Sequence, residues 1–334
     1  MKLRTFAASA VLAVLVTTGC ASGGGGGVTT DKKGVAHVDV AVLEAPSLTS
    51  FYAPIIDGKK LDIANGIDIN FVPSSTVALR TEIASGATKV TAGASVLTDA
   101  ALLNQRGADV VFLFNVFDWW GTVVTPVDTD IHEVADLEGK KVVGALSTTN
   151  YAMFKMTAGL NGVDLASLKE TSAEPSGLVA SAKSGREEAV ELWEPAHSVL
   201  TLGNEDFRSL DLIGEFRKAT GLERVPYVGV AVQRAWLNEN ESLVNPLYRT
   251  FADAVDFIKE NPDEAADLIA AGTKIDVEVL RSLLSAPDRL ALDVYPAKDA
   301  ASELDTLLDI ATKYGVLDTK PELESLVYMG DMKR

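Results

Sequence analysis

The feature that most constrains the fold of this chain is an alternation of strand-like and helix-like segments that runs twice along the sequence. In the first series, Val-rich or alternating stretches predict strands at 37–43, 67–72, 89–91 and 110–114. Helical spacing, together with capping residues or a terminating glycine, predicts helices at 51–63, 74–85 and 95–106. The continuous apolar run 110–114 is typical of a strand that is buried on both faces.

A second series follows and passes into a helical C-terminal region. It predicts strands at 141–145, 189–193 and 225–233, and helices at 148–160, at 174–184 and from Pro195 onward. Beyond residue 233 the pattern is almost entirely helical. One helical face there is apolar, and we expect it to pack on a sheet; it consists of Leu247, Phe251, Ala254, Val255 and Ile258.

Strands that alternate with helices form parallel sheets with helices on both sides. We therefore expect an α/β fold with two lobes, each a mostly parallel sheet flanked by helices. The chain is expected to cross between lobes at 125–128 and again at 225–227. This places 36–125 and 227–334 in lobe 1 and 126–226 in lobe 2.

The N-terminus has the layout of a secretory signal peptide. Lys2 and Arg4 precede an apolar run at 6–16, and small residues lead to Gly19 and Cys20. The run has eleven residues, whereas a membrane-spanning helix needs about 17–25. We expect residues 1–19 to be removed during export; a buried N-terminal helix is the alternative.

Cys20 is the only cysteine, so no disulfide can form within the chain. Residues 16–20 resemble a bacterial lipobox, in which the cysteine carries the lipid, although Thr17 stands where leucine is usual. The alternative is a buried structural thiol. The glycine-rich stretch that follows is a flexible coil, so residues 20–35 are expected to tether the body to the cell membrane, facing the periplasm or the cell exterior.

Charge and composition exclude several classes of function. The formal net charge is −17, which disfavours binding to nucleic acid through a charged surface. Three histidines and one cysteine are too few for a dedicated transition-metal site, and no cofactor is expected. His132–Glu133 lacks the second histidine of a zinc protease motif, and Gly139–Lys141 lacks the pattern of a phosphate-binding loop.

Several stretches resemble one family. The stretch 136–142 resembles an Asp-Leu-x-Gly-Lys-Lys-Val motif, 147–149 resembles a ligand-binding loop, and 178–195 resembles a helix–Gly–strand unit that ends in Trp-Glu-Pro. Together they are similar to the nitrate/sulfonate/taurine and thiamine-precursor group of ABC-importer binding proteins, over most of 37–260. The resemblance implies a type II periplasmic-binding-protein-like fold whose two lobes close on a solute.

Ligands of such sheets lie at the carboxyl ends of strands, beside helix N-termini. With the resemblance, this rule predicts the ligand-binding residues Ser47, Ser50, Phe51, Ser74, Ser95, Asn115, Trp119, Trp120, Thr148, Thr149, Asn150, Glu194 and Tyr227. The serines and threonines could instead be helix caps, the aromatic residues could be core, and the glutamate could cap its helix. Because consecutive strand residues point to opposite faces, one tryptophan is expected to pack inward and the other to line the cleft.

The predicted lining is rich in hydrogen-bond donors but contains no lysine or arginine, because Arg80 and Lys89 are expected to face solvent. Glu194 is expected to repel a simple anion. The predicted ligand is therefore a neutral or amine-bearing organic solute, such as a pyrimidine-like heterocycle or an amino-sulfonate, rather than nitrate.

The expected mechanism is closure of a monomer around its ligand, with hinges near Pro126 and Pro226, followed by recognition of the closed form by an ABC permease. Two alternatives are a tethered sensory module for a membrane receptor and an enzyme. The enzymatic relative of this fold, a fungal pyrimidine synthase, carries a cysteine-rich motif, whereas this chain has only Cys20.

Overall fold

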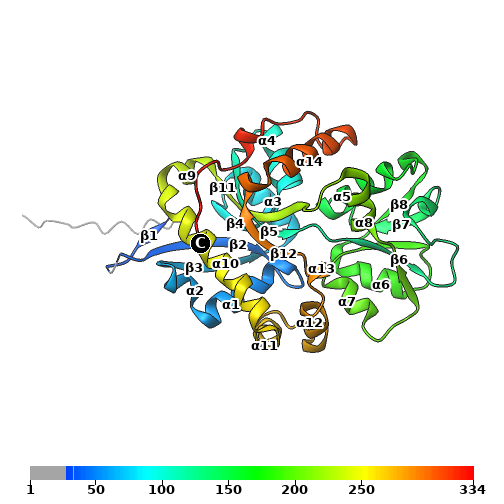
Figure 1. The fold of residues 1–334 in the computed structure, drawn as a ribbon, viewed down its shortest axis with the longest axis horizontal. Helices are drawn as coiled ribbons and strands as arrows, with labels where there is room; N and C mark the ends of the chain where they lie inside the picture. Colours follow the sequence, from blue (N-terminus) through cyan, green and yellow to red (C-terminus); the bar gives the residue numbers. More distant parts are fainter. Residues whose placement is uncertain (1–27, 33) are drawn as a thin grey trace, which may run out of the picture.

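The computed structural model describes residues 28–32 and 34–334, which form two α/β lobes side by side (Figure 1). The predicted signal peptide, Cys20 and residues 20–27 of the predicted tether lie outside the described residues. Among the helices that are described, none is both long enough and apolar enough to cross a membrane.

The first lobe is built on a seven-stranded sheet with the order β1-β2-β4-β11-β5-β12, and β3 pairs with β2. Its strands are β1 (Thr29–Thr30), β2 (Ala36–Leu43), β3 (Ile67–Ser74), β4 (Val90–Ser95), β5 (Val110–Asp118), β11 (Pro226–Gln233) and β12 (Leu292–Pro296). All nine residues of β5 are buried, as its apolar run predicts.

The second lobe is built on a five-stranded sheet with the order β10-β6-β9-β7-β8. Its strands are β6 (Thr122–Pro126), β7 (Lys141–Gly144), β8 (Lys169–Ser172), β9 (Ala189–Leu192) and β10 (Phe207–Ser209). This confirms the predicted two-lobed α/β fold.

Both sheets are mixed in strand direction, whereas the sequence predicted mostly parallel sheets. β2 is parallel to β3 and β4, and β7 is parallel to β8 and β9. However, β11 runs antiparallel between β4 and β5, and β6 runs antiparallel to β9. These are the strands by which the chain enters the second lobe and returns to the first, so neither belongs to a strand–helix–strand unit within one sheet.

The two segments that join the lobes lie next to each other. β5 ends at Asp118 and the next strand, β6, already belongs to the second sheet. The predicted boundary at 125/126 therefore falls inside β6, which lies between β10 and β9 in the second sheet, whereas the strand of the first sheet ends at Asp118. The return segment enters β11 at Pro226, and the backbone N–H of Trp119 donates to the carbonyl of Val225 at 2.8 Å.

Helices cover the first sheet on both sides (Figure 1). They are η1 (Leu48–Phe51), α1 (Tyr52–Lys59), α2 (Leu61–Ala64), α3 (Thr76–Ser85), the π-helix η2 (Val96–Ala101), α4 (Leu102–Gln105), α9 (Arg234–Asn240), η6 (Glu241–Leu243), α10 (Val244–Glu260), α11 (Pro262–Thr273), α12 (Val277–Leu284), α13 (Pro287–Leu290), η7 (Ala297–Ala300), α14 (Ala301–Lys313) and α15 (Leu323–Leu326). The predicted apolar face of α10 is buried, and the ring of Phe251 packs 5.9 Å from that of Phe114 in β5. This confirms that the face packs on the sheet.

The second lobe carries fewer and shorter helices. They are η3 (Val134–Leu137), α5 (Thr149–Leu160), η4 (Leu165–Ser167), η5 (Pro175–Gly177), α6 (Leu178–Lys183), α7 (Ala196–Thr201) and α8 (Leu212–Thr220). One hydrophobic cluster runs from the first lobe into the second, because Phe154 and Phe216 of the second lobe share it with Leu304 and Leu308 of α14. The lobes are thus packed together on one side of the crossing segments.

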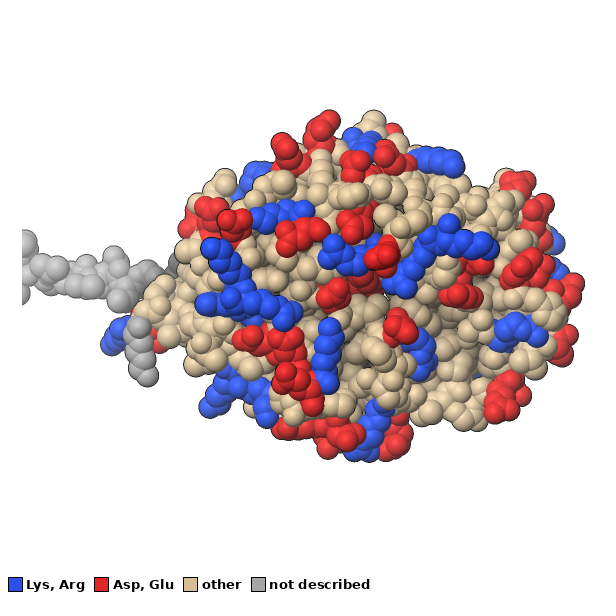
Figure 2. Space-filling view, viewed as in Figure 1, with Lys and Arg blue, Asp and Glu red and all other residues tan. Residues whose placement is uncertain are grey.

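Acidic and basic side chains are interspersed over the face of the molecule that Figure 2 shows, rather than separated into areas of one sign. Many of them form ion pairs within one lobe. Arg281, for example, pairs with Asp267 at 2.9 Å and with Glu278 at 2.6 Å.

Candidate functional site

A cavity of about 330 Å³ lies between the two lobes, where strands of both sheets reach their carboxyl ends. The first lobe contributes the ends of β2, β3 and β4, and the second lobe contributes the start of α5 and the segment after β9. Its walls include the polar residues Ser47, Thr49, Ser74, Ser75, Thr76, Ser95, Thr148, Thr149, Asn150, Ser176 and Tyr227, and the apolar residues Leu43, Leu48, Val77, Phe117, Trp193, Ala196 and Val228.

Helices from both lobes begin at this cavity. In the first lobe, Ser75 caps α3 by accepting a hydrogen bond from the N–H of Ala78 at 3.3 Å. In the second lobe, Thr148 caps α5 in the same way for Tyr151, also at 3.3 Å. A helix start carries backbone N–H groups without intrahelical partners and the positive end of the helix dipole. Helix starts that converge from two sides therefore favour a negatively charged group.

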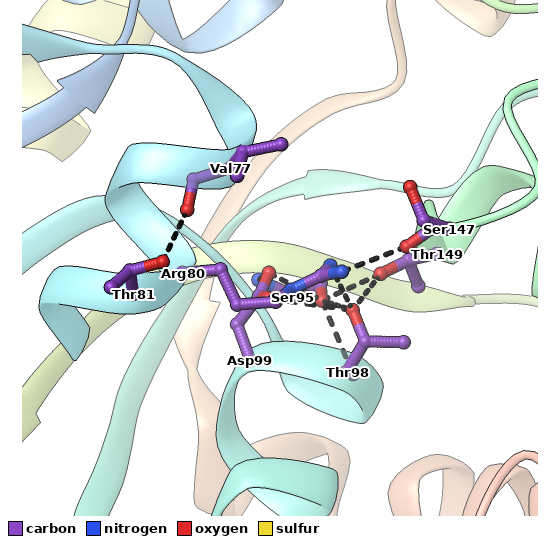
Figure 3. Close-up of polar contacts among 8 residues, drawn as sticks. All are labelled: Val77, Arg80, Thr81, Ser95, Thr98, Asp99, Ser147 and Thr149. Carbon is purple, nitrogen blue, oxygen red and sulfur yellow. Dashed lines mark hydrogen bonds and ion pairs between the residues drawn. The ribbon is translucent and has the colours of Figure 1, made fainter. Parts of the chain in front are cut away.

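Arg80, in α3, lines the cavity and bridges the two lobes (Figure 3). Its Nε pairs with Oδ1 of Asp99 at 2.7 Å, and its Nη2 donates to the hydroxyl of Thr98 at 3.0 Å. Its Nη1 donates to the carbonyl of Ser147, in the second lobe, at 2.8 Å. The prediction that Arg80 faces solvent is therefore wrong, because its face of α3 turns toward the start of η2.

Hydroxyl groups join the lobes next to Arg80 (Figure 3). Thr149, at the first turn of α5, donates from its Oγ1 to the Oγ of Ser95 at 2.7 Å and also contacts the hydroxyl of Thr98. Asp99 accepts the backbone N–H of Ser95 at 3.0 Å. The charge of Asp99 is thus held by Arg80 on one side and by the start of η2 on the other.

A second contact between the lobes involves Glu194. Its side chain is fully buried, although the residue forms part of the cavity wall. Its Oε2 accepts the backbone N–H of Ser198 at 3.1 Å, so it does cap α7. Its Oε1 lies 3.1 Å from Nη1 of Arg289 and 3.2 Å from Nδ1 of His197. Arg289 belongs to α13 of the first lobe, so the negative charge of Glu194 is compensated across the cleft.

The cavity brings together many of the residues that the sequence predicted for the ligand. Eight of them line it: Ser47, Ser74, Ser95, Thr148, Thr149, Asn150, Glu194 and Tyr227. Their contact with a ligand stays a prediction. They share one property that a sequence can show, since each stands at or near the end of a strand or the start of a helix.

Three other predicted residues have structural roles away from the cavity wall. Phe51 is buried in the core, and Ser50 donates to the carbonyl of Ser47 at 2.6 Å. Asn115 is fully buried, donates to Asp118 at 3.0 Å and accepts the N–H of Tyr227 at 3.1 Å. It fastens β5 to β11 rather than facing a solute.

The two consecutive tryptophans also lie outside the cavity wall. Trp119 packs inward, with its ring centroid 5.7 Å from that of Phe216 and its Nε1 donating to Oδ1 of Asn150 at 3.0 Å. Trp120 is half-buried and packs against the ring of His197 at 5.1 Å. The expectation that one of the two lines the cleft is wrong, because the crossing segment turns Trp120 toward α7.

Several cavity residues were not predicted. Trp193 and Glu174 stand at a strand end and a helix start, where the rule that found the others could have found them. Arg289, which does not line the cavity itself but pairs with Glu194 of its wall, carries no such signal, because it comes from a late helical region. Lys89, expected in a strand and in solvent, precedes β4, is half-buried, and donates to the carbonyl of Gly86.

Two buried carboxyl groups lie near the cleft and the crossings. Burial raises the pKa of Glu191, in β9, to about 8, and its Oε2 has no hydrogen-bond partner among the described residues. Burial also raises the pKa of Asp118 to about 6, against the opposing effect of a hydrogen bond from Tyr295. The pKa of Tyr227 is raised by its own burial and then by the nearby Glu191.

Two α/β lobes that are joined by paired crossing segments and enclose a cavity at their strand ends define the two-lobed solute-binding fold. Residues 63–265 match the family described as NMT1/THI5 like, which is more than half of the chain, and the chain belongs to this family. No curated protein matches the chain.

Solved structures of the same fold include two sulfonate-binding proteins. The periplasmic aliphatic sulphonate binding protein SsuA from Escherichia coli is 16% identical, with a TM-score of 0.71 over 89% of this chain and 94% of that one. The alkanesulfonate-binding protein SsuA from Xanthomonas axonopodis pv. citri, bound to MOPS, is 16% identical with a TM-score of 0.71 over 87% and 98%. The desulfurization enzyme DSZB is 12% identical, with a TM-score of 0.58 over 86% and 95%. At these identities the likeness shows the fold.

Proposed function

We propose that this chain is an extracytoplasmic solute-binding protein that captures a small organic anion between its lobes and delivers it to the permease of an ABC importer. The observation that carries this proposal is the convergence of helix starts from both lobes on a cavity in which Arg80 is paired with Asp99 and Glu194 is paired with Arg289. The sulfonate-binding relatives support the same class of ligand.

The helix starts favour an anionic group on the ligand, and two of the acidic residues beside them are offset by arginines. Arg80 is paired with Asp99, and Glu194 is paired with Arg289. The N–H groups at the starts of α3 and α5 then offer an anionic group its partners. Glu44 and Glu174 also line the cavity and form no ion pair among the described residues, which favours a ligand that carries an amine as well. The argument that Glu194 repels anions loses its force, because Arg289 offsets that charge. Among the predicted ligand classes, an amino-sulfonate fits best.

The size and the walls of the cavity favour an organic ligand over a bare ion. Its volume of about 330 Å³ is roughly ten times the share of one water in the liquid, about 30 Å³. Leu43, Phe117 and Trp193 give it apolar surface, against which carbon atoms can pack. Nitrate has no carbon atoms to use that surface.

In the proposed mechanism, the ligand is captured when the two lobes close around it. A ligand that contacts the start of α3 in one lobe and the start of α5 in the other has more contacts when the lobes are together. It therefore shifts the population toward the closed form. The paired crossing segments around Trp119 and Val225 are the proposed hinge, and the closed form is the state that the permease recognises.

The location is part of the proposal. Export through residues 1–19, lipidation at Cys20 and a flexible tether would hold a monomeric body beside the membrane that contains the permease. C20S should move the protein from the membrane fraction to the soluble fraction without changing its ligand affinity. Retention in the membrane fraction would exclude the lipid anchor.

Calorimetry with a panel of solutes tests the ligand class. The panel contains taurine, ethanesulfonate, sulfate, nitrate and an aminopyrimidine. We expect a sulfonate to bind with a Kd in the micromolar range, which corresponds to about −8 kcal/mol, and nitrate to bind far more weakly. Binding of the aminopyrimidine but of no sulfonate would overturn the proposed class. Mass spectrometry of the recovered ligand separates binding, which returns it intact, from a DSZB-like activity, which would consume it.

A further inference from the structure

Arg289 is the one residue of α13 that the structure shows reaching the second lobe by hydrogen bonds, and it contacts three side chains there. Its Nη1 lies 3.1 Å from Oε1 of Glu194, 3.2 Å from Nδ1 of His197 and 3.4 Å from Oγ of Ser198. Helix α13 lies between the lobes in Figure 1, and the neighbouring α12 packs on α7. These bonds exist only while the lobes are together.

The protonation state of His197 decides whether Arg289 can occupy this position. Arginine nitrogens only donate hydrogen bonds, so the contact with Nδ1 requires a lone pair on that nitrogen. In that tautomer the imidazole is neutral and its proton is on Nε2, which lies 2.8 Å from Oγ of Ser209; a proton on Nδ1 would instead point at Oε1 of Glu194, 3.2 Å away. In this state Arg289 donates to both His197 and Glu194.

A second proton on His197 produces a different set of bonds. Nδ1–H can then donate to Oε1 of Glu194, which lies 3.2 Å away within the second lobe. The same N–H points at Nη1 of Arg289, so two cationic donors face each other at 3.2 Å. Glu194 cannot serve both at full strength, because both approach the same oxygen.

The surroundings of His197 leave Arg289 as the partner that is displaced. The groups that contact its ring are Glu194 from its own segment, Ser209 from β10, Arg289 from α13, and the ring of Trp120 at 5.1 Å. Ser209 can accept or donate, and an aromatic ring accommodates a cation. Only Arg289 is repelled when the imidazole becomes charged, and only Arg289 comes from the other lobe.

We propose that Arg289 is a positioning residue that latches the closed cleft onto Glu194, and that protonation of His197 releases this latch. The proposal deepens the proposed function, since it describes how the same cleft holds and releases its solute. It predicts slow ligand release near neutral pH and faster release in acid.

The first experiment measures lobe separation and needs no ligand. The full chain carrying C20S has no other cysteine, so cysteines introduced at the exposed positions Ser85, in the first lobe, and Ser184, in the second, can carry spin labels. Pulsed electron resonance should show a short inter-lobe distance at about pH 8 and a larger share of long distances at about pH 5.

Three variants decide between the latch and a general effect of pH. R289Q should show the long-distance population at both pH values. H197N keeps an acceptor near the place of Nδ1 but cannot be charged, so it should stay closed at both. R281Q is the matched control, because Arg281 forms its ion pairs within the first lobe, and it should behave like the parent. A pH response that persists in H197N, or closure unaffected by R289Q, would overturn the proposal.

A second experiment uses ethanesulfonate or taurine as the probe and follows binding by stopped flow. R289Q should raise the release rate by about tenfold or more, as expected for loss of a hydrogen bond between charged groups, and leave the association rate nearly unchanged. R289K is measured beside it, because it keeps the charge if R289Q does not fold, and it should give a smaller increase. An equal loss in both rates would mean a merely structural role and would overturn the latch. If no probe binds, the proposed ligand class is wrong. The inter-lobe distance measurement still tests the latch, because it needs no ligand.

Discussion

The hydroxyl of Tyr295 donates a 2.5 Å hydrogen bond to Oδ1 of Asp118, and this bond ties β12 to the residue where the chain leaves the first lobe. The same carboxyl group accepts the side-chain N–H of Asn115 at 3.0 Å and the backbone N–H of Val225 at 3.4 Å. Asp118 therefore lies where the chain leaves the first lobe and also holds the segment by which the chain returns. Its protonation state should affect how firmly the two crossings are held.

The first prediction concerns the pH dependence of stability through Asp118. Burial raises its pKa from 3.8 to about 6, so the folded state binds the proton more tightly than the unfolded state. The resulting stability is fully present below about pH 4 and is lost as the pH rises through about 6, by on the order of 2–3 kcal/mol. D118N should remove this part of the pH dependence in denaturant titrations. D318N, at an exposed carboxyl, should leave it unchanged, and an unaltered pH profile in D118N would refute the assignment.

Glu191 should produce a similar loss at higher pH. Its pKa is raised by burial from 4.5 to about 8, so it is protonated in the folded protein at neutral pH. This part of the stability should be fully present below about pH 4.5 and be lost as the pH rises through about 8, by on the order of 4–5 kcal/mol in total, and E191Q should abolish the loss. Thermal unfolding over this range is the measurement. If E191Q and the parent lose stability in parallel, Glu191 is not buried as described.

Gly229 should be irreplaceable in the central strand β11. A Cβ added there would lie 2.1 Å from the carbonyl oxygen of Phe114 and 2.4 Å from the ring of Phe112. Both neighbours belong to the buried strand β5 and cannot move far, so G229A should cost more than about 2 kcal/mol of unfolding free energy. G177A is the control, because a Cβ at Gly177 would meet no atom within 4 Å. Equal denaturation midpoints for the two variants would contradict this packing.

Arg80 should contribute to ligand affinity through closure. R80Q removes the ion pair with Asp99 and the bond to the carbonyl of Ser147, and it leaves a negative charge beside the site of the proposed anion. We expect an affinity at least about tenfold weaker for the sulfonate that binds best, in line with about 1.5–3 kcal/mol for a hydrogen bond to a charged group. R106Q, at an exposed position, should bind like the parent in calorimetry. Parent-like affinity in R80Q would remove Arg80 from the closing contacts.

Local patterns in the sequence predict the elements well, because each depends on neighbouring residues. The apolar run in β5, the caps at Ser75 and Thr148, and the apolar face of α10 all follow from spacing within one segment. The two series of alternating strands and helices then indicate two lobes, and the family resemblance implies that the lobes close on a solute. Because strand ends and helix starts meet at one edge of each sheet, most of the predicted small polar residues do line the cavity.

What could not be predicted depends on contacts between distant segments. The antiparallel insertion of β11 leaves no local trace, so the sheets were expected to be mostly parallel. Arg80 and Arg289 look like ordinary surface cations, because their partners Asp99 and Glu194 are identified only once η2 and α13 are placed. Strand alternation predicts that one of the two consecutive tryptophans lines the cleft, but at Trp119 and Trp120 the chain lies between β5 and β6, where it passes from one lobe to the other.

The position of β11 has a consequence for the order of folding. This strand occupies the middle of the first sheet, between β4 and β5, yet it is made only after the whole second lobe. A chain that emerges N-terminus first, from a ribosome or across a membrane, can complete the smaller sheet early, but β4 and β5 stay unjoined until residue 233 has appeared. Contacts this distant in sequence form slowly, and unpaired strand edges attract other chains. The first lobe is thus the first part of the protein to be made and the last to fold. Its unpaired strands β4 and β5 need protection from other chains until β11 has been made.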